Sequence, residues 1–235
     1  MKPVRVRDET LVVYSSERWK VLEKKRMKAK AVMEALRKVG LNPLLLGSVA
    51  RGDVREDSDI DVVILRPVPT YLIELAVEEG GFRIIRKEVV QPTPRHTPKA
   101  YIYLDEETSV HLPLAPLSKL EREFYWFGGV VDLQGVKRGK RVCGVNKELL
   151  FIKPVKEGHV EFSVIGREKE VARMLGVSVD IVSERVQVLT RRDEIGRTGV
   201  FVKLVLPPNS NIEAEVMKAA KKNPFLKRKI MGVLI

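Results

Sequence analysis

The chain has 235 residues, of which 44% are hydrophobic and 31% charged, so we expect one or two globular domains and not a disordered chain. Its single cysteine, Cys143, excludes an intrachain disulfide and a zinc site built from cysteines. No apolar run is long enough to span a bilayer, and the amino terminus lacks the small-residue cleavage site of a secretory signal, so we expect a cytoplasmic protein with no membrane partner.

The net charge of +12 is unevenly distributed along the chain. Residues 1–130 hold 22 Lys and Arg against 19 Asp and Glu, whereas the remaining residues hold 21 against 12. A basic second half favours a polyanionic partner such as nucleic acid, although a solvated basic surface explains the same excess. Abundant Lys, Arg and Glu beside few Asn, Gln and Cys is also typical of a thermophile protein.

The first half of the chain alternates helical and strand patterns. Apolar residues at helical spacing predict an amphipathic helix over 17–39, whose basic face we interpret as solvated. Short apolar or β-rich runs bounded by turn residues predict further strands and helices. The strands are expected at 44–46, 60–65, 82–90, 101–104 and 109–114, and the helices at 71–79 and 117–127. We therefore expect an α/β (α+β) domain.

The sequence pattern changes after Gly128-Gly129, where short strand-like runs are separated by basic turns. From Gly166 onward, two helical patterns joined by a Leu-Gly-Val-Ser turn resemble a helix-turn-helix. The run IGRTGVFVKLVL that follows is typical of a β-hairpin wing, so a winged-helix-like module is expected. The pattern over 212–222 predicts another amphipathic helix, and the basic and apolar end of the chain favours a docked or homodimerising tail.

The segment LLLGSVARGDVREDSDIDVVIL carries the most specific chemical signal. Gly47 lets the backbone turn and approach a ligand, and Ser48 with the amides after it can donate hydrogen bonds to a phosphate. Asp59 and Asp61 lie two residues apart, so on a strand both carboxylates point to one face while Ile60 points to the other. Paired carboxylates completed by substrate phosphates are the ligands that Mg²⁺ prefers in phosphoryl and nucleotidyl transfer.

This segment resembles the signature of the DNA polymerase beta-like nucleotidyltransferase superfamily, and especially its small prokaryotic and archaeal branch. The match consists of Gly47 and Ser48 after an apolar residue, a spacer, and then Asp59, Ile60 and Asp61. The resemblance implies a mixed β-sheet flanked by helices, a nucleoside triphosphate as substrate, and Mg²⁺ or Mn²⁺ as cofactor. It assigns Asp59 and Asp61 as catalytic metal ligands.

By the same resemblance, Gly47, Ser48 and Arg51 would hold the nucleotide. The adjoining Arg51-Gly52 and Asp57-Ser58 also look like the loop of the minimal family members. A structural interpretation, an acidic strand end after a glycine turn, competes with the functional one.

The third acidic residue of the family pattern is missing from the expected place. In the run Ser109-Val110-His111-Leu112, His111 stands where an acid is expected. An imidazole suits Mn²⁺ or Zn²⁺ better than Mg²⁺, so we expect His111 to be a third metal ligand, an acid at 105–107 to replace it, or activity to be reduced. A polar residue satisfied within the sheet is the competing interpretation of His111.

Nucleic-acid contacts are expected from the second helix of the helix-turn-helix pattern and the residues after it. Arg191 and Arg192 follow that helix, and Arg197 lies near the tip of the predicted wing. Asp180 and Glu184 on the same helix would repel phosphates, so a structural or protein-binding module is the alternative.

Together these patterns predict a nucleotidyltransferase domain over 1–128, a β-rich connector over 129–158 and a winged-helix-like basic domain over 159–235. The expected activity moves a nucleoside monophosphate from a triphosphate to an acceptor hydroxyl, with nucleic acid the favoured acceptor. The alternative is a DNA-binding regulator in which the nucleotidyltransferase fold serves as a weakly active or inactive nucleotide sensor.

Overall fold

A computed structural model describes residues 2–196 and 199–231. The chain forms two compact units, each assembled from separate stretches of sequence. The first unit contains Met1–Lys28, Leu45–Ser58 and Lys119–Thr198, and the second contains Ala29–Leu44, Asp59–Ser118 and Gly199–Ile235. The predicted domain limits at 128 and 158 are a division along the sequence and stay a prediction.

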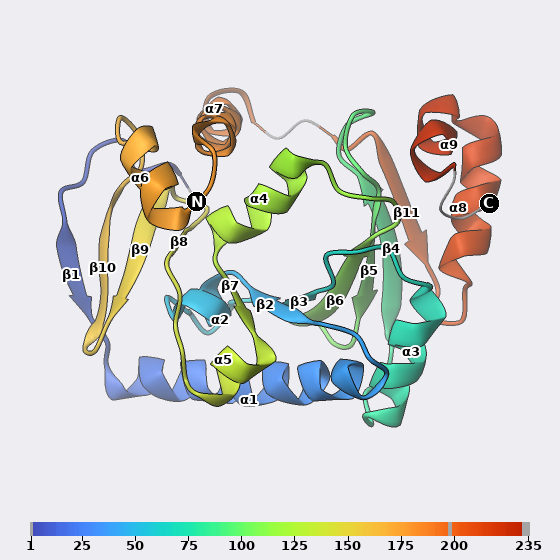
Figure 1. Cartoon of the computed structure of the whole chain (residues 1–235), viewed down its shortest axis with the longest axis horizontal. Helices are drawn as coiled ribbons and strands as arrows, with labels where there is room; N and C mark the ends of the chain where they lie inside the picture. Colours follow the sequence, from blue (N-terminus) through green and yellow to red (C-terminus); the bar gives the residue numbers. More distant parts are fainter. Residues whose placement is uncertain (1, 197–198, 232–235) are drawn as a thin grey trace. The chain divides into compact units, whose positions relative to one another are not determined.

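The first unit is built on a four-stranded sheet in the order β1-β10-β9-β8, with antiparallel neighbours (Figure 1). Phe151 and Phe162 face each other across β9 and β10, and their ring centroids are 4.9 Å apart. The strands of this sheet are β1 (Thr10–Val13), β8 (Gly144–Val145), β9 (Leu150–Val155) and β10 (Gly158–Ser163), and the unit also contains β7 (Val130–Asp132), which is not part of this sheet. Its helices are α2 (Ser48–Arg51), α4 (Lys119–Gly128), α5 (Leu133–Lys137), α6 (Glu168–Leu175) and α7 (Val179–Ile195). The helix α1 (Ser16–Lys38) begins in this unit and ends in the second, and β2 (Leu44–Leu46) also crosses the division.

The predicted pair of helices in the second half of the chain is confirmed. Gly176 ends α6 with a left-handed φ of 67°, a conformation that glycine adopts without a steric penalty, and α7 starts at Val179. Val171 and Val182 are buried in a core that includes Phe151 and Phe162 of the sheet. The helix pair therefore packs on the β9–β10 hairpin.

In the second unit, strands follow one another in the order β11-β4-β5-β6-β3 (Figure 1). The β3–β6 pair is parallel and the other pairs are antiparallel, so the sheet is mixed, as the family resemblance implied. The strands are β3 (Ile60–Val63), β4 (Arg86–Gln91), β5 (Lys99–Tyr103), β6 (Thr108–Pro113) and β11 (Val202–Leu206). The helices are α3 (Thr70–Glu79), α8 (Ile212–Lys222) and α9 (Pro224–Ile230).

One face of this sheet packs against helices. The ammonium of Lys87 on β4 is fully buried there, 2.8 Å from Glu74 of α3 and 2.8 Å from the carbonyl oxygen of Ser210, next to α8. Glu213 of α8 accepts hydrogen bonds of 2.7 Å from both the amide and the hydroxyl of Thr70 at the start of α3. Because side chains alternate along strands, the opposite face carries a different set, which includes Asp61 and His111.

The predicted hairpin wing is wrong. Its expected second strand is β11, which pairs antiparallel with β4, so that Val202 lies opposite Gln91. The run VKLVL has the composition of a strand, but the sequence does not say which strand it pairs with, and here the partner is more than 100 residues away. Among the described helices, none is long and apolar enough to cross a membrane.

Candidate active site

The turn after β2 has the backbone geometry that the motif predicted. Gly47 has φ 82° and ψ −145°, a combination that side chains disfavour, and a Cβ there would meet no heavy atom within 4 Å. Conformation and not crowding therefore requires glycine. The Gly47 amide donates to the carbonyl oxygen of Gly129 at 2.9 Å, and the amides of Ala50 and Arg51 donate to Gly47, which starts α2 at Ser48.

Arg51 is held within the first unit. Its Nε and Nη2 donate to the two carboxylate oxygens of Asp53 at 3.0 and 2.9 Å, and both side chains are nearly buried. Its Nη1 donates to the carbonyl oxygen of Gly128 at 2.5 Å. The aliphatic part of Arg51 fills a space beside Gly129 and Gly144, since a Cβ on either glycine would approach the Arg51 side chain within 2.8 Å. These contacts favour a structural role for Arg51, and its assignment to the nucleotide stays a prediction.

A second buried arginine, which the sequence analysis missed, also holds this loop. Arg26 of α1 donates to the carbonyl oxygens of Val49 and Ala50 at 3.0 and 2.9 Å, and to that of Lys140 at 2.8 Å. Burial lowers the pKa of Arg26 to about 10, so it stays charged at neutral pH. The expectation that the basic face of this helix is solvated is therefore wrong at Arg26 and at Lys25, which is 5% exposed. The helical spacing of apolar residues alone could not separate these two residues from their exposed neighbours.

The carboxylates of the motif lie at the start of β3. Asp59 is exposed just before the strand, and Asp61 is within it with a side chain that is 36% exposed. Asp61 lies opposite Ser109 in the parallel β3–β6 pair, and the Ser109 hydroxyl donates to Asp61 Oδ1 at 3.2 Å. Ser109 is therefore one side chain that orients this carboxylate, and the motif contained no signal for it.

His111 is on the same face of the sheet as Asp61. It lies opposite Val63, two residues along β3 from Asp61, and its Nε2 is 3.9 Å from Asp61 Oδ1. Its ring stacks on Tyr101 of β5, with centroids 4.9 Å apart and an angle of 12° between the planes. Burial, and to a smaller extent Lys99, lowers the pKa of His111 to about 3, so the imidazole is neutral at physiological pH. Its role as a ligand stays a prediction.

The acids that were considered as substitutes for His111 have other surroundings. Asp105 Oδ1 accepts hydrogen bonds of 3.0 Å from the amides of Glu107 and Thr108, which closes the turn between β5 and β6. Glu106 and Glu107 are exposed. These contacts explain Asp105 as a turn residue.

The donor chemistry of Asp59 and Asp61 fits a divalent cation in part. Two carboxylates supply hard oxygen ligands, and Mg²⁺ keeps several waters or substrate oxygens in its remaining positions. Within residues 2–196 and 199–231, no group of three or more His, Cys, Asp and Glu side chains is arranged to hold a metal ion. A metal held by these two carboxylates would take its remaining ligands from water or the substrate.

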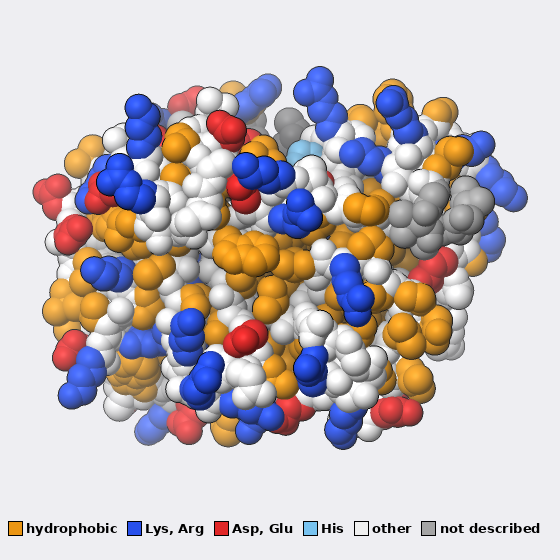
Figure 2. Space-filling model, viewed as in Figure 1, with side chains coloured by type: hydrophobic (Ala, Val, Ile, Leu, Met, Phe, Trp, Pro, Cys, Tyr) orange, Lys and Arg blue, Asp and Glu red, His pale blue; other side chains and the backbone are white. Residues whose placement is uncertain are grey.

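The arginines predicted to contact nucleic acid lie at the end of α7. Arg191 and Arg192 are exposed, and Arg197 lies outside the described residues. On the face shown in Figure 2, Lys and Arg side chains are dispersed among acidic and hydrophobic ones. This view favours no single concentrated phosphate-binding patch.

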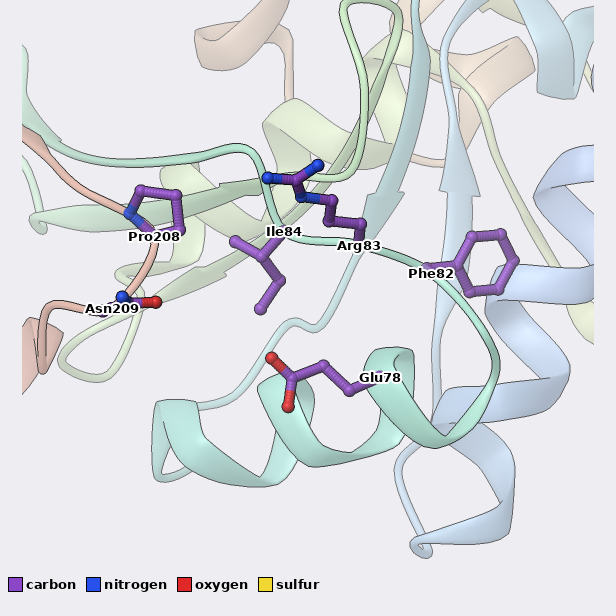
Figure 3. Close-up of a pocket in the computed structure, with 6 residues that line it drawn as sticks. All are labelled: Glu78, Phe82, Arg83, Ile84, Pro208 and Asn209. Carbon is purple, nitrogen blue, oxygen red and sulfur yellow. The ribbon is translucent and has the colours of Figure 1, made fainter.

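A cavity of about 440 Å³ lies apart from the motif, in the second unit. Figure 3 shows Glu78 on α3 reaching toward Ile84, with Pro208 and Asn209 on the other side. Phe82 and Arg83 complete the lining. Neither Asp61 nor His111 lines this cavity, so we assign it no part in the chemistry.

Comparisons with known proteins support the motif. Residues 26–125 match the family model described as "Nucleotidyltransferase domain". No curated protein and no solved structure gives a significant match to the chain. The matched residues include Gly47, Ser48, Asp59, Asp61 and His111. Over residues 26–125 the chain is thus similar to nucleotidyltransferase domains.

Proposed function

We propose that the protein transfers a nucleoside monophosphate from a nucleoside triphosphate to an acceptor hydroxyl and releases pyrophosphate. The observation that carries this proposal is the Asp59–Asp61 pair, which begins β3 within the matched domain and is accessible at Asp61. Transfer of this kind needs no nucleophile from the protein, because the acceptor oxygen attacks the α-phosphate directly. The Ser109 hydroxyl keeps the Asp61 carboxylate oriented toward its ligands.

Each half of the motif has a separate task in this proposal. Gly47 lets the chain turn, so that Ser48 would offer its amide and hydroxyl to the phosphates, on a loop that Arg26 and Arg51 hold. Asp59 and Asp61 would hold Mg²⁺ or Mn²⁺, which supplies charge neutralisation at the phosphates and a more reactive acceptor oxygen. His111, being neutral, would add a nitrogen donor without adding negative charge.

A second function, a DNA-binding regulator with a nucleotide-sensing domain, is favoured by two observations. The position expected for a third acid holds a neutral histidine, and α6 and α7 form a helix pair with exposed Arg191 and Arg192. In this alternative the domain binds nucleotide but turns it over slowly. The nucleic-acid contact through these arginines is likewise a proposal.

The test compares wild type with Asp59→Asn and Asp61→Asn, and uses Asp57→Asn as a matched control because Asp57 is an exposed neighbour on the preceding turn. Titration calorimetry measures triphosphate binding with and without Mg²⁺ or Mn²⁺, and labelled triphosphates report transfer. We expect both motif variants to lose metal-dependent binding and transfer while their melting temperatures stay unchanged. Equal affinity in all four proteins would refute the assignment, and binding without transfer to any acceptor would favour the regulator.

A further inference from the structure

A row of side chains runs across the sheet of the second unit, starting at Asp61. In the register of the strands, Asp61 of β3 lies opposite Ser109 of β6, Ser109 opposite Tyr103 of β5, and Tyr103 opposite Arg86 of β4. Directly opposed residues point to the same face of the sheet, so all four side chains lie on the face that carries Asp61. We call these four residues the Arg86 row. Three strand spacings, about 14 Å, separate its ends. A ligand that reaches from Asp61 to Arg86 must be larger than a simple sugar.

Beside the Arg86 row, two residues away along the strands and on the same face, lies a second set of cross-strand neighbours, which we call the His111 row. His111, Tyr101 and Glu88 lie opposite one another on β6, β5 and β4. Tyr101 stacks on His111 and also on Tyr103, with centroids 6.4 Å apart and an angle of 21° between the planes. The His111 row is largely buried, whereas Arg86 is 41% exposed. The Arg86 row therefore has buried neighbours beside it and is accessible at both ends.

Arg86 and Tyr103 form a stacked pair at the far end of the row. The guanidinium carbon of Arg86 lies 4.2 Å from the centroid of the Tyr103 ring. Arg86 Nε is also 3.3 Å from Glu88 Oε1, while Lys203 of β11 is 3.6 Å from the other oxygen of the same carboxylate. Two cations share one carboxylate, so this end of the row has a net positive charge.

The tyrosine keeps its proton at neutral pH, because burial and the nearby Glu88 raise the pKa of Tyr103. The row thus offers a metal-binding carboxylate, a hydroxyl, an aromatic ring with a hydroxyl donor, and a planar cation. Stacking on aromatic rings and guanidinium planes, combined with cations for the backbone, is how single-stranded nucleic acid is bound without sequence preference. An anionic acceptor with planar bases matches each of these groups.

We propose that the Arg86 row binds the end of a single-stranded nucleic acid, whose terminal hydroxyl lies at Asp61 while a base and a phosphate contact Tyr103 and Arg86. This inference rests on the proposed nucleotidyl transfer and names its acceptor. It places the acceptor on the sheet of the nucleotidyltransferase domain and not on α7. Tyr103 and Arg86 are then the residues that determine acceptor specificity.

The experiment measures binding of a labelled single-stranded oligonucleotide to the full chain by fluorescence anisotropy, over a range of salt concentrations. Loss of one stacking partner in Arg86→Gln or Tyr103→Leu is expected to weaken binding about tenfold. Arg86→Gln should also lower the slope of log K against log salt by about 0.7, the contribution of one phosphate contact in a single strand. Arg86→Lys should keep that slope but not the full affinity, and Tyr103→Phe should bind nearly as wild type.

Arg83→Gln is the matched control, because Arg83 is an exposed arginine three residues before Arg86 that lines the separate cavity of Figure 3. It should bind the oligonucleotide as wild type, and melting curves should show all variants folded. Triphosphate binding in calorimetry separates the two proposals. If wild type binds no triphosphate, the proposed function fails, yet weaker oligonucleotide binding by Arg86→Gln would still support the row.

Three results would overturn the inference. The first is wild-type affinity for the oligonucleotide in both Arg86→Gln and Tyr103→Leu. The second is no oligonucleotide binding by wild type even at low salt. The third is displacement of the oligonucleotide by a nucleoside monophosphate at equal concentration, since this would assign the row to a small phosphorylated acceptor.

Discussion

The two halves of the nucleotidyltransferase motif are built in opposite ways. The Gly47–Arg51 loop is fixed from below by two buried guanidinium groups, Arg26 and Arg51, which donate to carbonyl oxygens and to Asp53. Asp61 lies on a strand, accepts a hydrogen bond from the hydroxyl of Ser109, and has a third of its side chain exposed. The first half thus has charged residues that hold the backbone, and the second has a carboxylate that is partly exposed. A charged residue inside such a motif can therefore stabilise the loop itself, and contact of Arg51 with a nucleotide stays a prediction.

The largest expected effect comes from removing the buried guanidinium group of Arg51. Arg51→Ala leaves the Asp53 carboxylate, 7% exposed, without its cation, and should lower the free energy of unfolding by about 3–5 kcal/mol. Chemical denaturation measures this value. Arg55→Ala is the control, because Arg55 pairs with Glu148 at the surface and its loss should cost at most about 0.5 kcal/mol. Similar losses in the two variants would show that Arg51 is not a structural residue.

The second prediction tests whether a charged side chain also stabilises the second unit through hydrogen bonds. Glu213→Ala removes the carboxylate that accepts both hydrogen bonds from Thr70, and should cost about 1–2 kcal/mol in denaturation. Glu215→Ala on the same helix loses only a surface pair with Lys218, so its effect should stay within about 0.5 kcal/mol. If Glu215→Ala were the more damaging change, the Glu213–Thr70 contact would have no special role.

The third prediction concerns His111, which lies beside the partly exposed carboxylate of Asp61. Because His111 is neutral and 3.9 Å from Asp61, activity of wild type should be higher with Mn²⁺ than with Mg²⁺. His111→Asp should raise activity with Mg²⁺ several-fold, and His111→Ala should weaken the use of Mn²⁺. Steady-state transfer rates in each metal measure the preference. A series that responds equally to both metals would remove His111 from the site.

The smallest expected effect lies on α7. Replacing both Arg191 and Arg192 by Gln removes two exposed positive charges, so nucleic-acid binding should weaken only a few-fold and lose part of its salt dependence. The matched measurement is the oligonucleotide titration used for Arg86. A larger loss here than in Arg86→Gln would move the main contact from the sheet to the helix pair.

Local patterns predicted most of the elements but not the long-range pairings. The helix predicted at 212–222 has the same bounds as α8, because its apolar spacing and its capping residue Asn211 are encoded nearby. The short helices α2 and α5 were missed, since four or five residues carry too little periodicity. The partner of β11 was also missed, because local spacing contains no information about a strand over 100 residues earlier.

The candidate nucleotide-binding and metal-binding residues that the sequence predicted all lie in one short segment of the chain, apart from His111. Asp59 and Asp61 are marked by their alternation, and Gly47 by the turn it must form. Ser109 and Arg26 have no such mark, because their roles depend on which strand or helix lies beside them. The same reason explains why the contact of Arg51 with Gly128 was not predicted, because these two residues lie far apart in the sequence.

The position of β11 late in the sequence affects how the chain folds while it is being synthesised. The β4 strand emerges from the ribosome with Gln91, but its neighbour is complete only at Leu206, on the order of ten seconds later at ordinary elongation rates. During that delay the backbone of β4 is an open edge that another nascent chain can pair with. Chains made on the same messenger are therefore exposed to mispairing at β4, and chaperone binding to this nascent edge would protect the yield of folded protein.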